Sequence, residues 1–162
     1  MLKEGQIAPI FTLPDDVGKQ HLLSDYLGHK IILYFYAHDN TQGCTNEALA
    51  FKAAYHEFCE RDSIIIGISK DSPASHERFR EKYALPFLLL SDTDLTVIKA
   101  YDVWHLKMMY GKTSYGVVRS TFIIDENGII EKTYEKVKPE QNAEEILRYL
   151  IKELPGTSSS VK

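Results

Sequence analysis

The chain has 162 residues, of which 44% are hydrophobic and 26% charged, a composition typical of one globular domain with a sizeable core. Its net charge is −4 and basic residues form no long run, so nucleic acid and anionic membrane surfaces are poor candidates for a partner. It contains no apolar run close to the roughly 20 residues that span a bilayer and no apolar secretory signal, so we expect a cytoplasmic protein.

The first two thirds of the chain alternate between apolar strands and helices. Residues 31–36 (IILYFY) and 63–69 (SIIIGIS) are continuous apolar runs that predict buried strands, and residues 87–90 predict a third. Apolar residues at helical spacing predict one helix over residues 44–59. A serine followed by proline, a favourable helix start, predicts another over residues 73–83.

The last third of the chain has a different pattern. Residues 94–101 predict a short helix, and residues 104–116 an irregular segment. Residues 120–124 and 129–134 are short β-prone runs on either side of an Asp-Glu-Asn-Gly sequence, which predicts a hairpin.

The two ends of the chain complete the predicted fold. Asn142, with a glutamate three residues on, predicts the capping residue of a closing helix. Two short strands are predicted near residues 11–13 and 21–23. We therefore expect an α/β, thioredoxin-like fold with a mixed central sheet flanked by helices and an N-terminal β extension. Residues 1–154 form one domain in this prediction, and residues 155–162 a flexible C-terminal tail.

The chain has two cysteines, too few for a disulfide framework, so their reactivity is the question they raise. Cys44 follows the strand at residues 31–36 by a short polar loop and falls near a helix N-terminus, where free N–H groups and the helix dipole favour a thiolate. Thr41 lies within reach of the sulfur or of an incoming oxygen, and Gly43 permits close approach at the turn. From position alone, a buried unreactive cysteine is an equal alternative.

Residues 34–48 (YFYAHDNTQGCTNEA) resemble the active-site segment of peroxiredoxins of the bacterioferritin-comigratory-protein type, also called peroxiredoxin Q. In that family a Pro-x-x-x-Thr-x-x-Cys motif opens a helix, and the threonine and cysteine of this chain match its spacing. Residues 101–113 and 119–125 resemble the later signature of the family in the same order. The resemblance covers about residues 3–152.

The resemblance implies that Cys44 is the peroxidatic thiolate and that Thr41 orients the peroxide through its hydroxyl. Arg119 is implied to favour the thiolate and to stabilise charge on the peroxide oxygens, a role that suits its permanent charge and fixed fork of donors. With Thr41 and Arg119, Gly43 is predicted to contact the substrate. Without the resemblance, a surface arginine is the favoured interpretation of Arg119. Glu47 is a candidate brace for Arg119, and an exposed helix glutamate is the alternative.

The chain departs from the family pattern at three positions. Gln42 replaces a proline that is frequent just before the Gly-Cys pair. Ala37 stands where the motif has proline, and Leu49 stands where many members have a resolving cysteine. Cys59 cannot replace the resolving cysteine within a continuous helix, because fifteen residues at about 1.5 Å each separate the two backbones by roughly 22 Å. A disulfide needs a Cα separation below about 7 Å. We therefore predict a structural Cys59 on the apolar face of the helix and a one-cysteine enzyme, with a disulfide between two chains as a further possibility.

Together these features predict a thiol peroxidase that needs no metal, flavin or haem. It is expected to reduce hydrogen peroxide and alkyl hydroperoxides through a Cys44 sulfenic acid, and to be restored by thioredoxin, glutaredoxin or a small thiol. The resemblance favours a monomer or a weak homodimer. A redox sensor that oxidises once without turnover is the alternative from another class, and a structural thioredoxin-like module with an unreactive Cys44 is the third.

Overall fold

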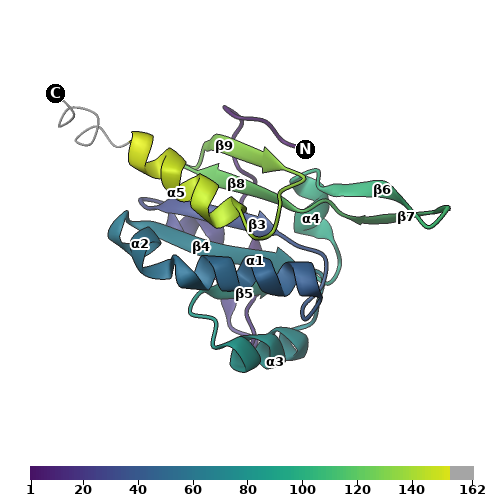
Figure 1. Ribbon diagram of the computed structural model, residues 1–162. Coiled ribbons are helices and arrows are strands. Elements are labelled where there is room, and N and C mark those ends of the chain that lie inside the picture. Colours follow the sequence, from purple (N-terminus) through teal and green to yellow (C-terminus); the bar gives the residue numbers. More distant parts are fainter. Residues whose placement is uncertain (154–162) are drawn as a thin grey trace.

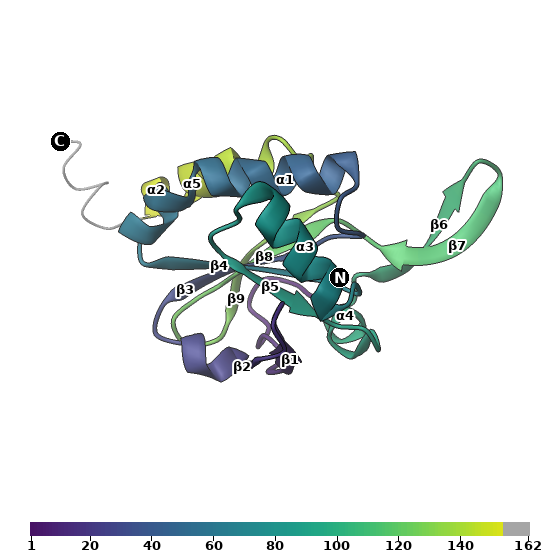
Figure 2. The ribbon, with the colours of Figure 1, turned by 90° about the horizontal axis from the view of Figure 1, so that it is seen from below.

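The computed structural model describes residues 1–153, apart from the side chains of Met109 and Glu153, so the tail predicted at residues 155–162 lies outside the described residues. A central five-stranded sheet has helices against one face and a smaller layer against the other (Figures 1 and 2). The strands are β1 (Thr12–Pro14), β2 (Gln20–Leu22), β3 (Lys30–Phe35), β4 (Ser63–Ser69), β5 (Leu88–Ser91), β6 (Trp104–Met109), β7 (Lys112–Val117), β8 (Ser120–Ile124) and β9 (Ile130–Glu135). The helices are η1 (Leu23–Tyr26), α1 (Gln42–Ala53), α2 (Tyr55–Glu60), α3 (Pro73–Tyr83), α4 (Thr96–Ala100) and α5 (Asn142–Glu153).

The central sheet has the strand order β5-β4-β3-β8-β9. β3, β4 and β5 are parallel, whereas β8 and β9 each pair antiparallel with their neighbours. β3 lies in the middle and pairs Leu33 with Ile66 of β4 on one side and with Phe122 of β8 on the other. The prediction of a thioredoxin-like fold with a mixed sheet flanked by helices is confirmed.

Alternate residues of β3 point to opposite faces of the sheet, as in any strand. Ile32 and Tyr34 pack on the face covered by α1, α2, α3 and α5, in a core that includes Phe51. Ile31 and Phe35 pack on the other face, beside α4 and the β1–β2 pair (Figure 2). Because both faces are buried, the strand is apolar at consecutive positions, which explains the unbroken run in the sequence.

Several predicted elements have the bounds expected for them. β4 spans the predicted residues, and α3 begins at Pro73 with the Ser72 hydroxyl accepting a hydrogen bond of 3.2 Å from the Ser75 backbone N–H. The N-terminal β extension is the antiparallel pair of β1 and β2. Among residues 1–153, none of the helices has the length and apolarity needed to cross a membrane.

The helix predicted over residues 44–59 is interrupted at Ala54, whose φ of −96° and ψ of 3° separate α1 from α2. Phe58 of α2 is fully buried, but Cys59 is exposed, so the prediction that Cys59 lies on the apolar face is wrong. Cys59 is the next residue after the buried Phe58, so at 3.6 residues per turn it lies about 100° from Phe58 around the axis of α2. It therefore sits at the edge of the apolar face, and that edge is open to solvent.

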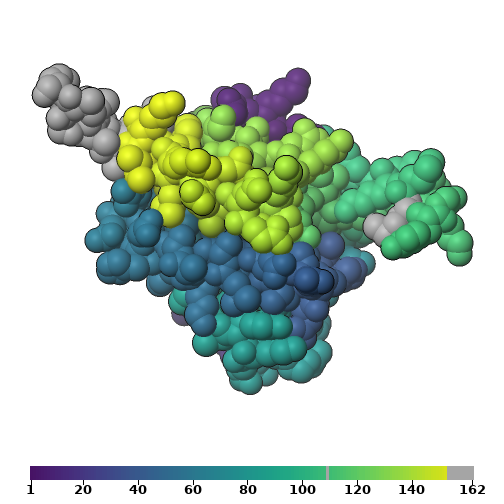
Figure 3. Space-filling model, viewed as in Figure 1, coloured from purple at the N-terminus to yellow at the C-terminus, as the bar shows by residue number. Residues whose placement is uncertain are grey.

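The segment predicted to be irregular, residues 104–116, is instead an antiparallel hairpin of β6 and β7 that projects from the body of the protein (Figures 1 and 3). Its two-residue turn is Tyr110-Gly111, with φ values of 53° and 76°. Positive φ at both positions is the requirement of the type I′ turn that suits tight hairpins. The signal missed in the sequence was the glycine at the second turn position, preceded by Leu106 and Met108 in alternation with His105 and Lys107.

Asn142 is the first residue of α5 rather than its capping residue, so the predicted capping box is wrong. Its side chain is fully buried, and its Oδ1 accepts a hydrogen bond of 2.7 Å from the hydroxyl of Thr121 in β8. This hydrogen bond joins α5 to the sheet. It occupies Oδ1 of Asn142, the atom that would accept a hydrogen bond from a backbone N–H if Asn142 capped the helix.

Candidate active site

Cys44 is the third residue of α1 and is only 2% exposed. The loop after β3 turns the chain at Asn40, whose φ of 64° is tolerated by asparagine, and Thr41 then takes the extended backbone of a helix N-cap. The Thr41 carbonyl accepts the 2.8 Å hydrogen bond from the Thr45 N–H. Cys44 thus lies in the first turn of the helix, where the positive end of the helix dipole favours an anion.

Arg119 immediately precedes β8, the strand beside β3, and its side chain reaches Cys44. Because Ser120 pairs with Phe35, Arg119 lies at the end of β3 where the loop to α1 begins. Its Nη2 donates to the Cys44 sulfur at 3.5 Å, and its Nη1 donates to Oε1 of Glu47 at 2.9 Å. The structure therefore brings together the three residues that the sequence analysis grouped as nucleophile, cation and brace.

Glu47 is fully buried, so the alternative of an exposed helix glutamate is wrong. Burial raises the pKa of its carboxyl, and the charge and hydrogen bond of Arg119 lower it, giving a pKa of about 7. Burial lowers the pKa of Arg119, but the negative charges of Glu47 and Cys44 outweigh it and the pKa is raised above its usual value. Arg119 therefore remains a cation beside the sulfur.

Gly43 provides the space that Arg119 occupies. A Cβ atom at this position would lie 3.0 Å from Nη2 of Arg119 and 3.6 Å from Cγ of Pro139. A larger residue would therefore press on the nitrogen that contacts the Cys44 sulfur. The group that approaches this glycine at the turn is the guanidinium of Arg119.

Thr41 is exposed and lies three residues before the buried Cys44. Its hydroxyl donates a 3.1 Å hydrogen bond to the carbonyl of His38. Since the hydroxyl proton is engaged in this bond, the oxygen lone pairs remain available to accept a hydrogen bond from a bound molecule.

Two residues close to the site were missed in the sequence. Lys107 of β6 donates to the Val117 carbonyl; burial and the charge of Arg119 lower its pKa, and the charge of Cys44 acts in the opposite direction. Lys107 thus adds a second cation to the surroundings of Cys44, and only the unpredicted hairpin places it there. Tyr34 is the other: burial, then the charges of Glu47 and Cys44, raise the pKa of its phenol.

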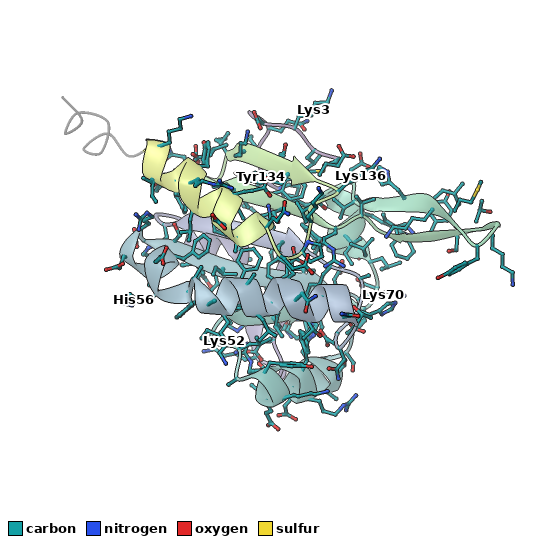
Figure 4. All side chains as sticks on the ribbon, in the orientation of Figure 1. Lys3, Lys52, His56, Lys70, Tyr134 and Lys136 are labelled. Atoms are coloured by element: carbon teal, nitrogen blue, oxygen red, sulfur yellow. The ribbon has the colours of Figure 1, made fainter. Side chains whose placement is uncertain are left out.

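Cys59 is remote from this site. Figure 4 shows His56 of α2 at one end of the α1–α2 unit and Lys70 beside the opposite end, where α1 begins. Cys59 and Tyr55 line a pocket of about 450 Å³ whose lining does not include Cys44. Both cysteines are free thiols.

Comparison with known proteins gives a consistent family. The profile of the AhpC/TSA family matches residues 5–133. Peroxiredoxin Bcp of Bacillus subtilis is 47% identical over 146 residues, which cover 90% of this chain and 93% of that protein. Peroxiredoxin Bcp of Escherichia coli is 39% identical over 149 residues, which cover 92% of this chain and 96% of that protein.

A solved structure supports the same relationship. The chain is similar to the bacterioferritin comigratory protein of Xanthomonas campestris, with a TM-score of 0.82 and 38% sequence identity over 86% of this chain and 89% of that one. The Xanthomonas protein is described as having alkyl peroxide reduction activity.

Proposed function

The chain belongs to the AhpC/TSA family and is a peroxiredoxin, a thiol-dependent peroxidase, and we propose that Cys44 is the sulfur that attacks the peroxide. The observation that carries this proposal is the 3.5 Å contact between Arg119 Nη2 and the Cys44 sulfur at a helix N-terminus. Cation and helix dipole both favour the thiolate, which is the reactive form of cysteine.

The thiolate of Cys44 attacks the terminal oxygen of a hydroperoxide ROOH in line with the O–O bond. A sulfur–oxygen bond forms, the O–O bond breaks, and the sulfur becomes a sulfenic acid that keeps the proton of that oxygen. The departing alkoxide takes a proton from water to give the alcohol ROH, and hydrogen peroxide follows the same path with R as hydrogen. The likeness to the Xanthomonas protein supports alkyl hydroperoxides as substrates.

Arg119 and Thr41 act on the two peroxide oxygens in this proposal. The Thr41 oxygen accepts a hydrogen bond from the O–H of the hydroperoxide, because its own proton is donated to the His38 carbonyl. The guanidinium donates to the oxygen on which negative charge develops as the O–O bond breaks. Glu47 keeps the guanidinium in place through the 2.9 Å bond to Nη1 and does not itself touch the substrate.

An external thiol completes the proposed cycle. A thiol R′SH condenses with the Cys44 sulfenic acid to give a mixed disulfide and water, and a second thiol releases Cys44 as a disulfide forms in the reductant. Leu49 occupies the position of the common resolving cysteine, and Cys59 is exposed on α2, the helix that follows the C-terminal end of α1 (Figure 1); both facts support the one-cysteine route. A thioredoxin-type dithiol supplies both thiols in one molecule; glutaredoxin and small thiols are the alternatives.

The setting follows from this chemistry. We place the protein in the cytoplasm, where reducing conditions keep both cysteines as free thiols. A single domain over residues 1–154 is supported by the two apolar cores on opposite faces of one sheet. For the oligomeric state we keep the proposal of a monomer or a weak homodimer.

Turnover in the presence of a reductant tests the function. With excess hydrogen peroxide and a thioredoxin system, the reduced protein should consume many equivalents of peroxide, and Cys44→Ser should consume none. A protein that consumes one equivalent and stops would be a redox sensor and would contradict the proposal.

A further inference from the structure

The loop between β3 and α1 is fastened to the rest of the protein by the Asp39 carboxylate. Its Oδ1 accepts a 2.6 Å hydrogen bond from the Tyr36 hydroxyl, and its Oδ2 accepts one of 2.8 Å from the Ser75 hydroxyl. The same Oδ2 lies 2.7 Å from Nδ1 of His76, and the Asp39 N–H donates to Asp71 Oδ2 at 2.8 Å. The loop is thus tied both to α3 and to the segment that follows β4.

His76 faces two hydrogen-bond acceptors and is fully buried. Nδ1 faces the carboxylate of Asp39, and Nε2 lies 3.1 Å from the carbonyl of Leu90 in β5. A neutral imidazole has only one N–H. Its other ring nitrogen would then place a lone pair against the lone pair of an acceptor oxygen. An imidazolium donates to both acceptors and neutralises the buried carboxylate, whose side chain is only 4% exposed.

The pKa of the Asp39 carboxyl is lowered in this environment. Burial would raise the pKa of its carboxyl, but the hydrogen bond and the charge of His76 lower it below the usual value, together with the hydroxyls of Tyr36 and Ser75. Asp39, Asp71 and His76 are near enough to one another to hold a metal ion. Their hydrogen bonds to protein groups already account for the arrangement, so we assign them to the ion pair.

On the basis of the proposed function, we infer that His76 is a positioning residue for peroxide reduction: a buried imidazolium that, through Asp39, fixes the loop that carries Thr41 and leads to Cys44. The connection to the reacting groups is short. The His38 carbonyl that accepts the Thr41 hydroxyl belongs to the peptide unit whose N–H is that of Asp39. Anchoring Asp39 therefore sets the direction of that carbonyl and, through it, the orientation of the Thr41 oxygen.

The inference explains how this loop keeps its shape with Ala37 at the position of the motif proline. A proline restricts the backbone by its ring. Here the restriction comes from the side chain two residues later, which is held by Tyr36, Ser75 and His76. Correct placement of groups around a peroxide matters, since a misplacement of about 1 Å costs roughly 100-fold in rate.

The test separates peroxide reactivity from general thiol reactivity in a Cys59→Ser background. For His76→Gln, which keeps a polar side chain but removes the cation, the rate constant for oxidation of Cys44 by hydrogen peroxide should fall by about 10- to 100-fold. Alkylation of Cys44 by iodoacetamide, which does not need Thr41, should change by less than about threefold, or roughly 0.65 kcal/mol. Asp39→Asn should give the same pattern, and the double variant no larger loss, because both changes break one pair.

The matched control is Arg80→Met. Arg80 also joins α3 to backbone carbonyls, those of Leu85 and Phe87, but does not contact the loop after β3. It should lower the melting temperature while leaving both rate constants near those of wild type. In ¹⁵N NMR spectra of the wild type at neutral pH, His76 should show protons on both ring nitrogens.

The inference is overturned if His76→Gln keeps the wild-type peroxide rate, if its two rate constants fall together, or if His76 carries one ring proton. Asp39→Asn supplies the same kinetic test if His76→Gln does not fold. Failure of the proposed function has a different signature: wild-type Cys44 would then react with hydrogen peroxide no faster than free cysteine, which removes the positioning role as well.

Discussion

Arg119 lies with its Nη2 3.5 Å from the Cys44 sulfur, although 75 residues separate the two in the chain. The pairing of Ser120 with Phe35 produces this contact, since it brings the residue before β8 to the end of β3 from which the chain enters α1. The other nitrogen, Nη1, is held by Glu47. One guanidinium therefore contacts both a buried carboxylate and the sulfur.

Arg119→Lys should lower the rate constant for oxidation of Cys44 by hydrogen peroxide by about 100-fold. Lysine keeps the charge, but its ammonium cannot reproduce the planar fork that bonds the sulfur and Glu47 together. Stopped-flow fluorescence measures the rate. Arg78→Lys, the same change on the exposed side of α3, is the control and should react as wild type does. Equal rates for Arg119→Lys and wild type would contradict a role of the guanidinium.

Glu47 should make the free energy of unfolding depend on pH. Its pKa is about 7 in the folded protein and 4.5 as the ordinary value, so the folded state binds the proton more tightly. The contribution of Glu47 to the free energy of unfolding is therefore fully present below pH 4.5. It is lost as the pH rises through about 7, and the total loss is about 3 kcal/mol. Glu47→Gln cannot titrate, so urea unfolding should show a smaller loss of stability over this range. Identical pH slopes for the two proteins would refute the prediction.

Gly43→Ala should reduce peroxide reactivity without reducing stability. The added Cβ would lie 3.0 Å from Arg119 Nη2 and push that nitrogen from the sulfur, with an expected loss of about tenfold in rate. Alanine also favours the helix by up to about 1 kcal/mol over glycine. Stopped-flow kinetics and urea unfolding of the same samples check both effects. A variant that loses rate and stability in parallel would indicate general damage to α1 instead.

Cys59→Ser should keep the turnover number with a thioredoxin-type reductant within about twofold, a free-energy change of only about 0.4 kcal/mol. The reason is that Cys59 is exposed on α2, which follows the C-terminal end of α1, whereas Cys44 lies at the start of α1. Turnover assays and non-reducing electrophoresis after peroxide treatment are the measurements. Loss of turnover, together with loss of a disulfide-linked species, would show that Cys59 resolves the sulfenic acid.

The elements predicted well from the sequence are those whose signals are local. β3 and β4 are unbroken apolar runs because both of their faces are buried, and α3 starts with a serine cap followed by Pro73. Cys44 could be placed at a helix start for the same reason, since a polar loop and a helical pattern follow a strand. Fold class and nucleophile were therefore accessible from the residues and from the family resemblance.

What the sequence did not show depends on contacts between distant segments. Burial of Glu47 requires Arg119, the residue before β8, and the exposure of Cys59 depends on which part of α2 the sheet covers. The pairing of His76 with Asp39 joins residues 37 positions apart and has no spacing signature. The β6–β7 hairpin is a different case, because its Tyr110-Gly111 turn is a local signal that was overlooked.

The most direct measurement is stopped-flow oxidation of the fully reduced protein by hydrogen peroxide, with Cys44→Ser and Cys59→Ser alongside. Oxidation should be much faster than that of free cysteine, should persist in Cys59→Ser and should disappear in Cys44→Ser. Oxidation of the wild type no faster than that of free cysteine would contradict the assignment of Cys44 as the peroxidatic residue.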